Sequence, residues 1–143
     1  MPVDWLPVRL GRGIAMRRDM ALLRLLLLQL EEIDEDGQSI YEIGEDDLPI
    51  DGYTWDQVSY HYTLADEAGL VDAAGGPPLE GGIVFRRLTW AGHDFVDAVR
   101  DEEIWRKTRE GALAAGGFSI DLVKDLAKGF IRKKVEQLTG VDL

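Results

Sequence analysis

Hydrophobic and polar positions alternate with a helical period in the stretch TWDQVSYHYTLADEAGL. Its apolar residues recur at steps of four and three, which places them on one helix face: Val58, Tyr62 and Ala65. Thr54, followed three residues later by Gln57, is typical of a capping box at a helix start. Gly69 is suited to end the helix because glycine adopts the left-handed conformation without strain. The pattern predicts one helix over Thr54–Leu70.

Two short strand-like runs follow this predicted helix. Leu70–Ala73 and Ile83–Leu88 are separated by the stretch AAGGPPLEGG, whose four glycines and two prolines are typical of a loop. A helix followed directly by a β-hairpin is the pattern of a winged helix. We therefore predict a winged helix-turn-helix-like core in which residues 54–70 form the candidate recognition helix and residues 71–88 form the wing.

Further apolar runs predict helices on both sides of this core. The first covers Asp19 to about Asp34 and is apolar nearly all round, so we expect the C-terminal helix, a partner subunit or both to cover it. Residues 38–52 are predicted to include an edge strand, because Pro49 disfavours a central one. Thr89 and Ser119 are predicted N-caps of later helices. Asp101 begins either another turn or a separate helix.

These elements predict a mainly helical α+β fold with a two-stranded wing and additional C-terminal helices. At 143 residues and 45% hydrophobic, the chain is long enough for one domain with a sizeable core. We assign residues 1–18 to an N-terminal arm and residues 19–143 to a single domain with a C-terminal helical extension. The predicted core unites nine residues: Leu26, Leu30, Val58, Tyr62, Leu64, Leu70, Leu88, Phe95 and Val99.

The net charge of −11 comes almost entirely from one segment. Between Glu31 and Asp51 there are ten acids and no Lys or Arg, whereas the remaining 17 acids face 16 bases. The absence of cysteine excludes disulfides and thiolate metal sites and suits a reducing cytoplasm. The run LLRLLLLQL is too short to span a bilayer, and Arg24 interrupts it. No cleavage site follows that would make it a signal peptide.

Three stretches resemble a known family: RRDMALLRLLLLQLEE, GYTWDQVSYHYTLADEAGLV and RLTWAGHDFVDAVRDEEIWRKT, in this order. They look like the bacterial and phage family catalogued as domain of unknown function 2513. The resemblance covers roughly Met16 to the C-terminus. It implies a winged-helix-like fold and an association with prophages, and it implies no established activity. The third stretch is the most specific because it combines many polar and aromatic residues in one run: Trp90, His93, Phe95, Asp97, Arg100, Asp101 and Trp105.

Two groups of polar residues are candidates for function. His61 lies in the predicted recognition helix, where it either contacts a phosphate or base or bonds to a nearby carboxylate; we favour the second. His93, Asp97 and Arg100 share one helix face. They either bind a ligand or partner or form a structural network that orients their helix against the wing, and again we favour the structural role.

No catalytic constellation emerges from the sequence. There is no cysteine nucleophile, no G-x-S-x-G setting for a serine, no Walker pattern and no dinucleotide fingerprint. Only the spacing of His93 and Asp97 would suit a metal, which is weak support for a site. We therefore predict a protein that is not an enzyme and has no cofactor and no metal.

Two function classes remain. The first is a protein-interaction module, with a protein partner or a second copy of the chain as a homodimer. The second is a DNA-binding regulator, with base contacts from the recognition helix and phosphate contacts from the wing and arm: Ser59, Tyr60, His61, Arg86, Arg87, Arg9, Arg12, Arg17 and Arg18. A duplex binder makes on the order of six to ten phosphate contacts. Because Thr54–Leu70 has no Lys or Arg, we place protein interaction first.

Overall fold

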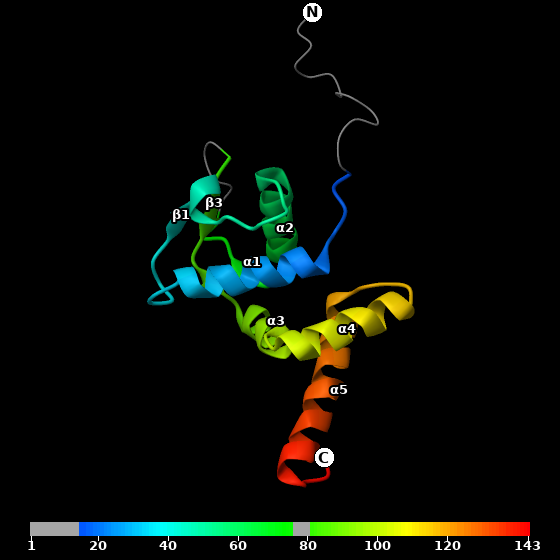
Figure 1. Ribbon diagram of the computed structural model, residues 1–143. Helices are drawn as coiled ribbons and strands as arrows, with labels where there is room; N and C mark the ends of the chain where they lie inside the picture. The colour runs from blue at the N-terminus through cyan, green and yellow to red at the C-terminus, as the bar shows by residue number, and fades with distance from the viewer. Residues whose placement is uncertain (1–14, 76–80) are drawn as a thin grey trace, which may run out of the picture.

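The computed structural model describes residues 15–75 and 81–143, and the predicted arginines at positions 9 and 12 lie outside them. The described residues form a mainly helical α+β fold with two small antiparallel sheets (Figure 1). The elements in chain order are α1 (Met20–Ile33), β1 (Tyr41–Ile43), the 3₁₀ turn η1 (Glu45–Asp47), α2 (Trp55–Glu67), β2 (Val71–Asp72), β3 (Ile83–Phe85), β4 (Arg87–Leu88), α3 (Trp90–Val99), α4 (Glu102–Ala114) and α5 (Ile120–Thr139).

Each helix begins where the sequence predicts a cap. The side chain of Thr54 accepts a hydrogen bond from the N–H of Gln57. The side chain of Gln57 accepts one from the N–H of Thr54, which completes the capping box. The other four caps also accept bonds from the first turn of their helices: Asp19, Thr89, Asp101 and Ser119. Asp101 therefore begins a separate helix, which is one of the two alternatives that the sequence left open. The predicted caps Thr54, Thr89 and Ser119 are confirmed.

The predicted hairpin is present, with one refinement. β2 pairs with β4, so that Val71 lies opposite Leu88, while β3 pairs with β1. The predicted strand over residues 83–88 is thus divided at Arg86, and its two parts have different partners. The predicted edge strand within residues 38–52 is β1. Residues 76–80 of the predicted wing tip lie outside the described residues.

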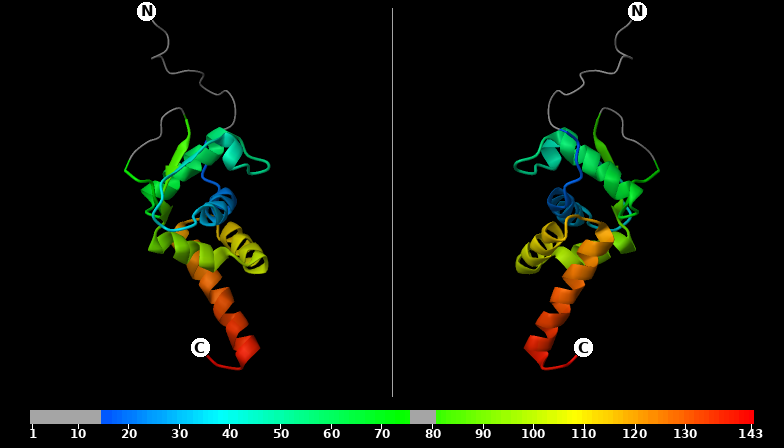
Figure 2. Two further views of the ribbon diagram at one scale, coloured as in Figure 1. Left: turned by 90° about the vertical axis from the view of Figure 1, so that its left-hand side faces the viewer. Right: turned by 90° about the vertical axis from the view of Figure 1, so that its right-hand side faces the viewer.

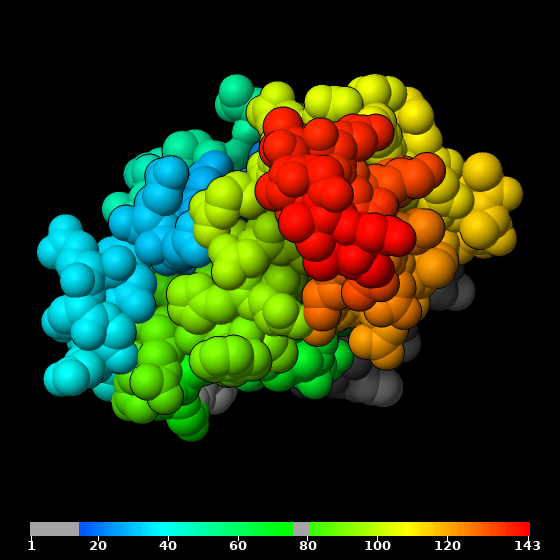
Figure 3. Space-filling view, turned by 90° about the horizontal axis from the view of Figure 1, so that it is seen from below, coloured from blue at the N-terminus to red at the C-terminus, as the bar shows by residue number. Residues whose placement is uncertain are grey.

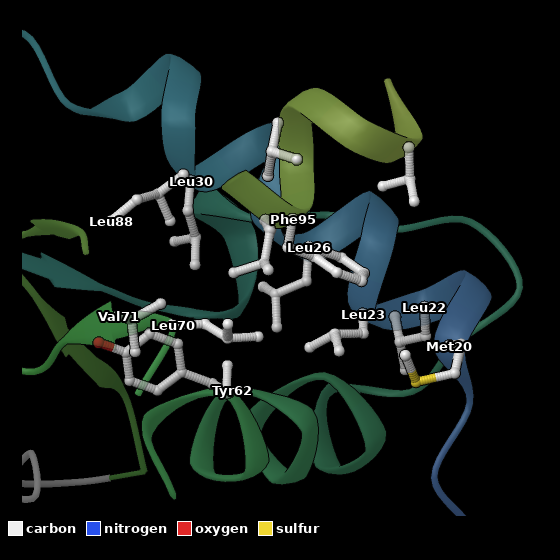
Figure 4. Close-up of a cluster of buried hydrophobic side chains, with 14 of the residues drawn as sticks. Met20, Leu22, Leu23, Leu26, Leu30, Tyr62, Leu70, Val71, Leu88 and Phe95 are labelled. Atoms are coloured by element: carbon white, nitrogen blue, oxygen red, sulfur yellow. The ribbon is translucent and has the colours of Figure 1, made fainter. Parts of the chain in front are cut away.

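α1 lies at the centre of the core. It contacts α2 and β4 on one side and α3 on the other. Figure 4 shows its leucine side chains meeting Tyr62 of α2, Leu70 and Val71 of the hairpin, and Phe95 of α3. Eight of the nine predicted core residues are buried. Leu64 is the exception because, at about 100° per residue, it lies about 120° away from the buried face of α2.

A buried arginine joins α1 to the C-terminal helices. The Arg24 side chain is 7% exposed, and its Nε and Nη2 donate to the carbonyls of Val99 (2.7 Å) and Arg100 (2.9 Å). These carbonyls end α3, where the helix dipole favours a positive charge. The guanidinium also lies 5.6 Å from the ring centre of Trp105. Burial lowers the pKa of Arg24, although the charges of Glu102 and Asp101 act in the opposite direction.

The last helix does not cover α1 in the predicted way. α5 packs against α4 and α3, and it is α3 that packs against α1. Only Val123 and Ala127 of α5 are buried, and the helix projects beyond the other elements (Figures 1 and 2). Seen from below, its end stands out over α3 (Figure 3). In the described part of the chain, no helix has the length and apolarity that a membrane span requires.

We propose that the projecting half of α5, where Val135 and Leu138 are exposed, packs against a second copy of the chain. Light scattering at micromolar concentration should then give twice the chain mass of 16.0 kDa, because association removes this apolar surface from water. Leu138→Asp should give the monomer mass, while Leu113→Asp, at an exposed leucine of α4, should stay dimeric. A 16.0 kDa particle for the unmodified chain would contradict the proposal.

Candidate functional site

His61 is a structural residue of the core. Its side chain is 1% exposed, and both ring nitrogens have backbone partners. Nδ1 lies 2.8 Å from the carbonyl oxygen of Gln57, and Nε2 accepts from the N–H of Asp19 at 2.7 Å. A donor Nδ1 and an acceptor Nε2 describe the neutral ring. The prediction of His61 as a base contact is wrong, because its ring points into the core. The favoured prediction, a hydrogen bond from His61 to a nearby carboxylate, is also wrong, because both partners of the ring are backbone groups.

Asp19, whose N–H donates to His61, forms several further hydrogen bonds through its side chain. Besides capping α1 through Oδ1, it accepts a hydrogen bond at Oδ2 from the hydroxyl of Tyr53 (2.9 Å). Burial raises the pKa of Tyr53, and the bond to Asp19 acts in the same direction. One carboxylate therefore ties the start of α1 to the segment that leads into α2.

The outer face of α2 is acidic. Ser59 is half-buried and donates to the carbonyl of Asp56, while Tyr60 is exposed. The exposed charges of this helix are Asp56, Asp66 and Glu67. A phosphate backbone that approached this face would meet negative charge and no base from the helix itself.

The predicted cations are dispersed. Arg86 lies 3.4 Å and Arg87 4.0 Å from a carboxylate oxygen of Asp72, so part of their charge is already paired. Arg17 and Arg18 lie before α1, and Arg18 donates to the carbonyl of Phe118 at 2.6 Å. The structure therefore places the wing arginines and the N-terminal arginines in different surroundings.

An open groove of about 1040 Å³ separates α2 from the hairpin and the start of α3. Its walls are mostly apolar: Tyr62, Val71, Val84, Leu88 and Trp90. The hydroxyl of Tyr62 donates to the carbonyl of Val84 at 2.6 Å, which fixes α2 against the wing. Burial raises the pKa of Tyr62, and the charges of Asp66 and Asp72 add to the increase. The phenol is a neutral structural group that forms part of the groove wall.

Trp90 stands at the mouth of this groove with 89% of its surface exposed. Its backbone is held firmly, because Thr89 donates to the carbonyls of Gly69 and Leu70. Gly92 permits this approach, since a Cβ there would lie 2.0 Å from the carbonyl oxygen of Leu70. A rigid support thus presents a large apolar ring to solvent. Sequence reasoning placed Trp90 in the helix without recognising its exposure, which depends on contacts 20 residues away.

The polar cluster of α3 is a network with α1. Arg100 makes two hydrogen bonds of 2.8 Å to Glu31 and one of 3.1 Å to Asp97. Nδ1 of His93 lies 3.8 Å from the same Glu31. The expected link to the wing is therefore wrong, because the cluster joins α3 to α1. The hydrogen bonds from Arg100 lower the pKa of Glu31.

Other members of the acidic segment build its turns. Oδ1 of Asp34 accepts from the N–H groups of Asp36 and Gly37, and Asp36 in turn accepts from the side chain and N–H of Ser39. These bonds lower the pKa of Asp36 to about 2. Short acidic side chains are suited to such turns because they reach the backbone two or three residues on. In the described residues no group of acids and histidines is arranged to hold a metal ion.

Comparison with known proteins gives the family. The sequence model described as "Hypothetical protein (DUF2513)" matches residues 17–119. The chain belongs to this family. An uncharacterized protein of Haemophilus influenzae is similar to this DUF2513 protein, with 31% identity over 118 residues that cover 81% of the present chain and 96% of the relative. No solved structure matches. The family match ends before α5, although the resemblance in sequence was traced to the C-terminus.

Replacing Glu31 by Gln should lower the free energy of unfolding near neutral pH by about 1 kcal/mol, since the paired Arg100 is half exposed. Folding lowers the pKa of Glu31, so its stabilisation is present above the unfolded pKa and is lost as the pH falls through the folded value. Urea unfolding of both proteins should show the difference shrinking towards about pH 3. Glu32→Gln is the matched control and should change little. A difference that is independent of pH would contradict this role.

Proposed function

We propose that this DUF2513 protein is a non-enzymatic adaptor that binds a segment of another protein in the groove between α2, the wing and α3. The observation that carries the proposal is the exposed Trp90 on its rigid support beside an apolar groove. Exposed aromatic anchors of this kind supply much of the binding energy at protein interfaces. Association would remove the ring and the groove wall from water.

The architecture supports an interaction module of the winged-helix type. The order of the elements supports this reading, because a helix (α1), a strand (β1), a helix (α2) and the β2–β4 pair follow one another as the first helix, first strand, recognition helix and wing do in that fold. In this proposal η1 and the turn after it would correspond to the second helix of the fold. We infer that the module uses the space beside its recognition helix and not the acidic outer face of that helix.

Charge narrows the chemistry of the partner segment. Arg86 and Arg87 form ion pairs with Asp72 and so neutralise its charge. Asp66, at the rim of the groove, makes no ion pair within residues 15–75 and 81–143. The nearby outer face of α2 adds further negative charge. A segment with an apolar side chain for the groove and a flanking Lys or Arg for Asp66 would complement both features.

A DNA-binding regulator is the second candidate, and the winged-helix-like order of elements favours it. Its base contacts would come from Ser59 and Tyr60, since His61 is buried. Arg86 and Arg87 would contact phosphates only after exchanging Asp72 for the duplex, at the cost of their present pairing. The acidic face of α2 would have to lie against the duplex, and this repulsion places the DNA function second.

Trp90→Ser should abolish capture of the protein partner from a lysate of the cell that makes this protein. Removal of a buried aromatic anchor costs about 2 kcal/mol or more, which is a loss of about thirtyfold or more in affinity. Leu113→Ser, at an exposed leucine of α4, is the control and should retain the partner. Capture should also survive nuclease. Partners that vanish with nuclease, or that Trp90→Ser retains, would overturn the proposal.

Affinity for random duplex at ~0.15 M salt should be weaker than the non-specific range of roughly 10⁻⁴–10⁻⁶ M, because α2 repels phosphate. An electrophoretic titration, together with selection from genomic fragments, measures both the non-specific and the specific term. Should one site be enriched with nanomolar affinity, the DNA function would move to first place. Replacing Arg86 and Arg87 would then flatten the salt dependence by about two contacts.

A further inference from the structure

A second pocket, of about 390 Å³, lies where the residues before α1 meet α2 and α4. It shares no lining residue with the Trp90 groove. Three arginines line it, and they come from separate parts of the chain: Arg17, Arg18 and Arg109. We call it the arginine pocket. The pocket therefore collects positive charge in a chain whose net charge is −11.

The arginines of this pocket have no carboxylate partner in the described residues. None of the three takes part in an ion pair there, although most other bases near acids in the fold do. Arg18 is positioned by a bond to the carbonyl of Phe118, a neutral group that leaves its charge in place. Arg109 lines the pocket together with Tyr53, and its charge acts to lower the pKa of Tyr53 against the stronger effect of burial.

The acid in the pocket wall does not cancel this charge. Asp19 accepts hydrogen bonds from neutral groups, at Oδ1 from the N–H groups of Ala21 and Leu22 and at Oδ2 from the hydroxyl of Tyr53, so it keeps a single negative charge. One carboxylate against three guanidinium groups leaves the wall positive. Because Asp19 occupies the start of α1, the donors open to a ligand are side chains and not the helix N-terminus.

We propose that the arginine pocket binds a phosphate-type oxyanion, carried either by inorganic phosphate or by a small phosphorylated molecule. Guanidinium groups donate paired N–H bonds that match the oxygens of phosphate. The volume exceeds that of one phosphate, and Tyr53 and Phe118 offer aromatic surface to an attached organic group. A duplex does not fit a recess of this size, and the lining residues are not those of the protein-binding groove.

Isothermal titration calorimetry on the full chain, in phosphate-free buffer of low ionic strength, tests the site with inorganic phosphate, AMP and adenosine. Phosphate or AMP should bind with a dissociation constant at or below about 1 mM. Arg17→Gln and Arg109→Gln should each weaken that binding about tenfold, since each removes a charge-assisted hydrogen bond. Arg106→Gln, on the same helix as Arg109 but outside the pocket, should leave it unchanged.

Comparison of the three ligands shows whether affinity comes from the phosphate group, from the attached organic group or from both. Equal binding of phosphate and AMP assigns the site to the anion alone, and tighter binding of AMP adds a contact to the organic group. Absence of binding by both at about 10 mM, adenosine binding as tight as AMP, or retention of affinity in Arg17→Gln and Arg109→Gln would each overturn the proposal. Circular dichroism melting checks that the variants remain folded, which is expected because the replaced side chains are exposed.

Discussion

Burial of α1 on two sides is the constraint on which the rest of the structure depends. A helix that is apolar nearly all round cannot rest on a single neighbour, so α2 and the hairpin cover one side and α3 covers the other. The charged Arg24 can lie inside this core because its guanidinium donates hydrogen bonds to the carbonyls at the end of α3. Glu31 and Arg100 close the same contact at the surface. α1 therefore joins α2 and the hairpin to α3.

This arrangement also limits where the proposed partner could bind. The inner face of α2 belongs to the core, where His61 accepts a hydrogen bond from the N–H of Asp19. Its outer face is acidic, which leaves the space beside the helix. There the tight contact of Gly92 with Leu70 fixes α3 and presents Trp90 to solvent. The proposed adaptor function follows from this combination of a rigid support, an apolar groove and negative charge.

Local features could be predicted from sequence, and features made by distant residues could not. The helix caps depend on neighbours within three residues, so Thr54 and Thr89 predicted their helix starts correctly. His61 was misjudged because the donor that binds its ring lies 42 residues away. The exposure of Trp90 was likewise missed, since helical periodicity does not reveal which faces other elements cover. In the sequence Glu31 is one of ten acids in a segment without bases, and its partner Arg100 lies 69 residues away, so the pairing could not be predicted.

Photo-crosslinking inside the cell tests the central claim most directly, which is that the Trp90 groove and not the outer face of α2 meets the partner. A benzophenone amino acid would replace His93, an exposed residue of the groove beside Trp90, in one protein and the exposed Tyr60 in another. The account predicts covalent products with protein at position 93 that persist after nuclease treatment. Products with nucleic acid at position 60, and none with protein at position 93, would contradict it.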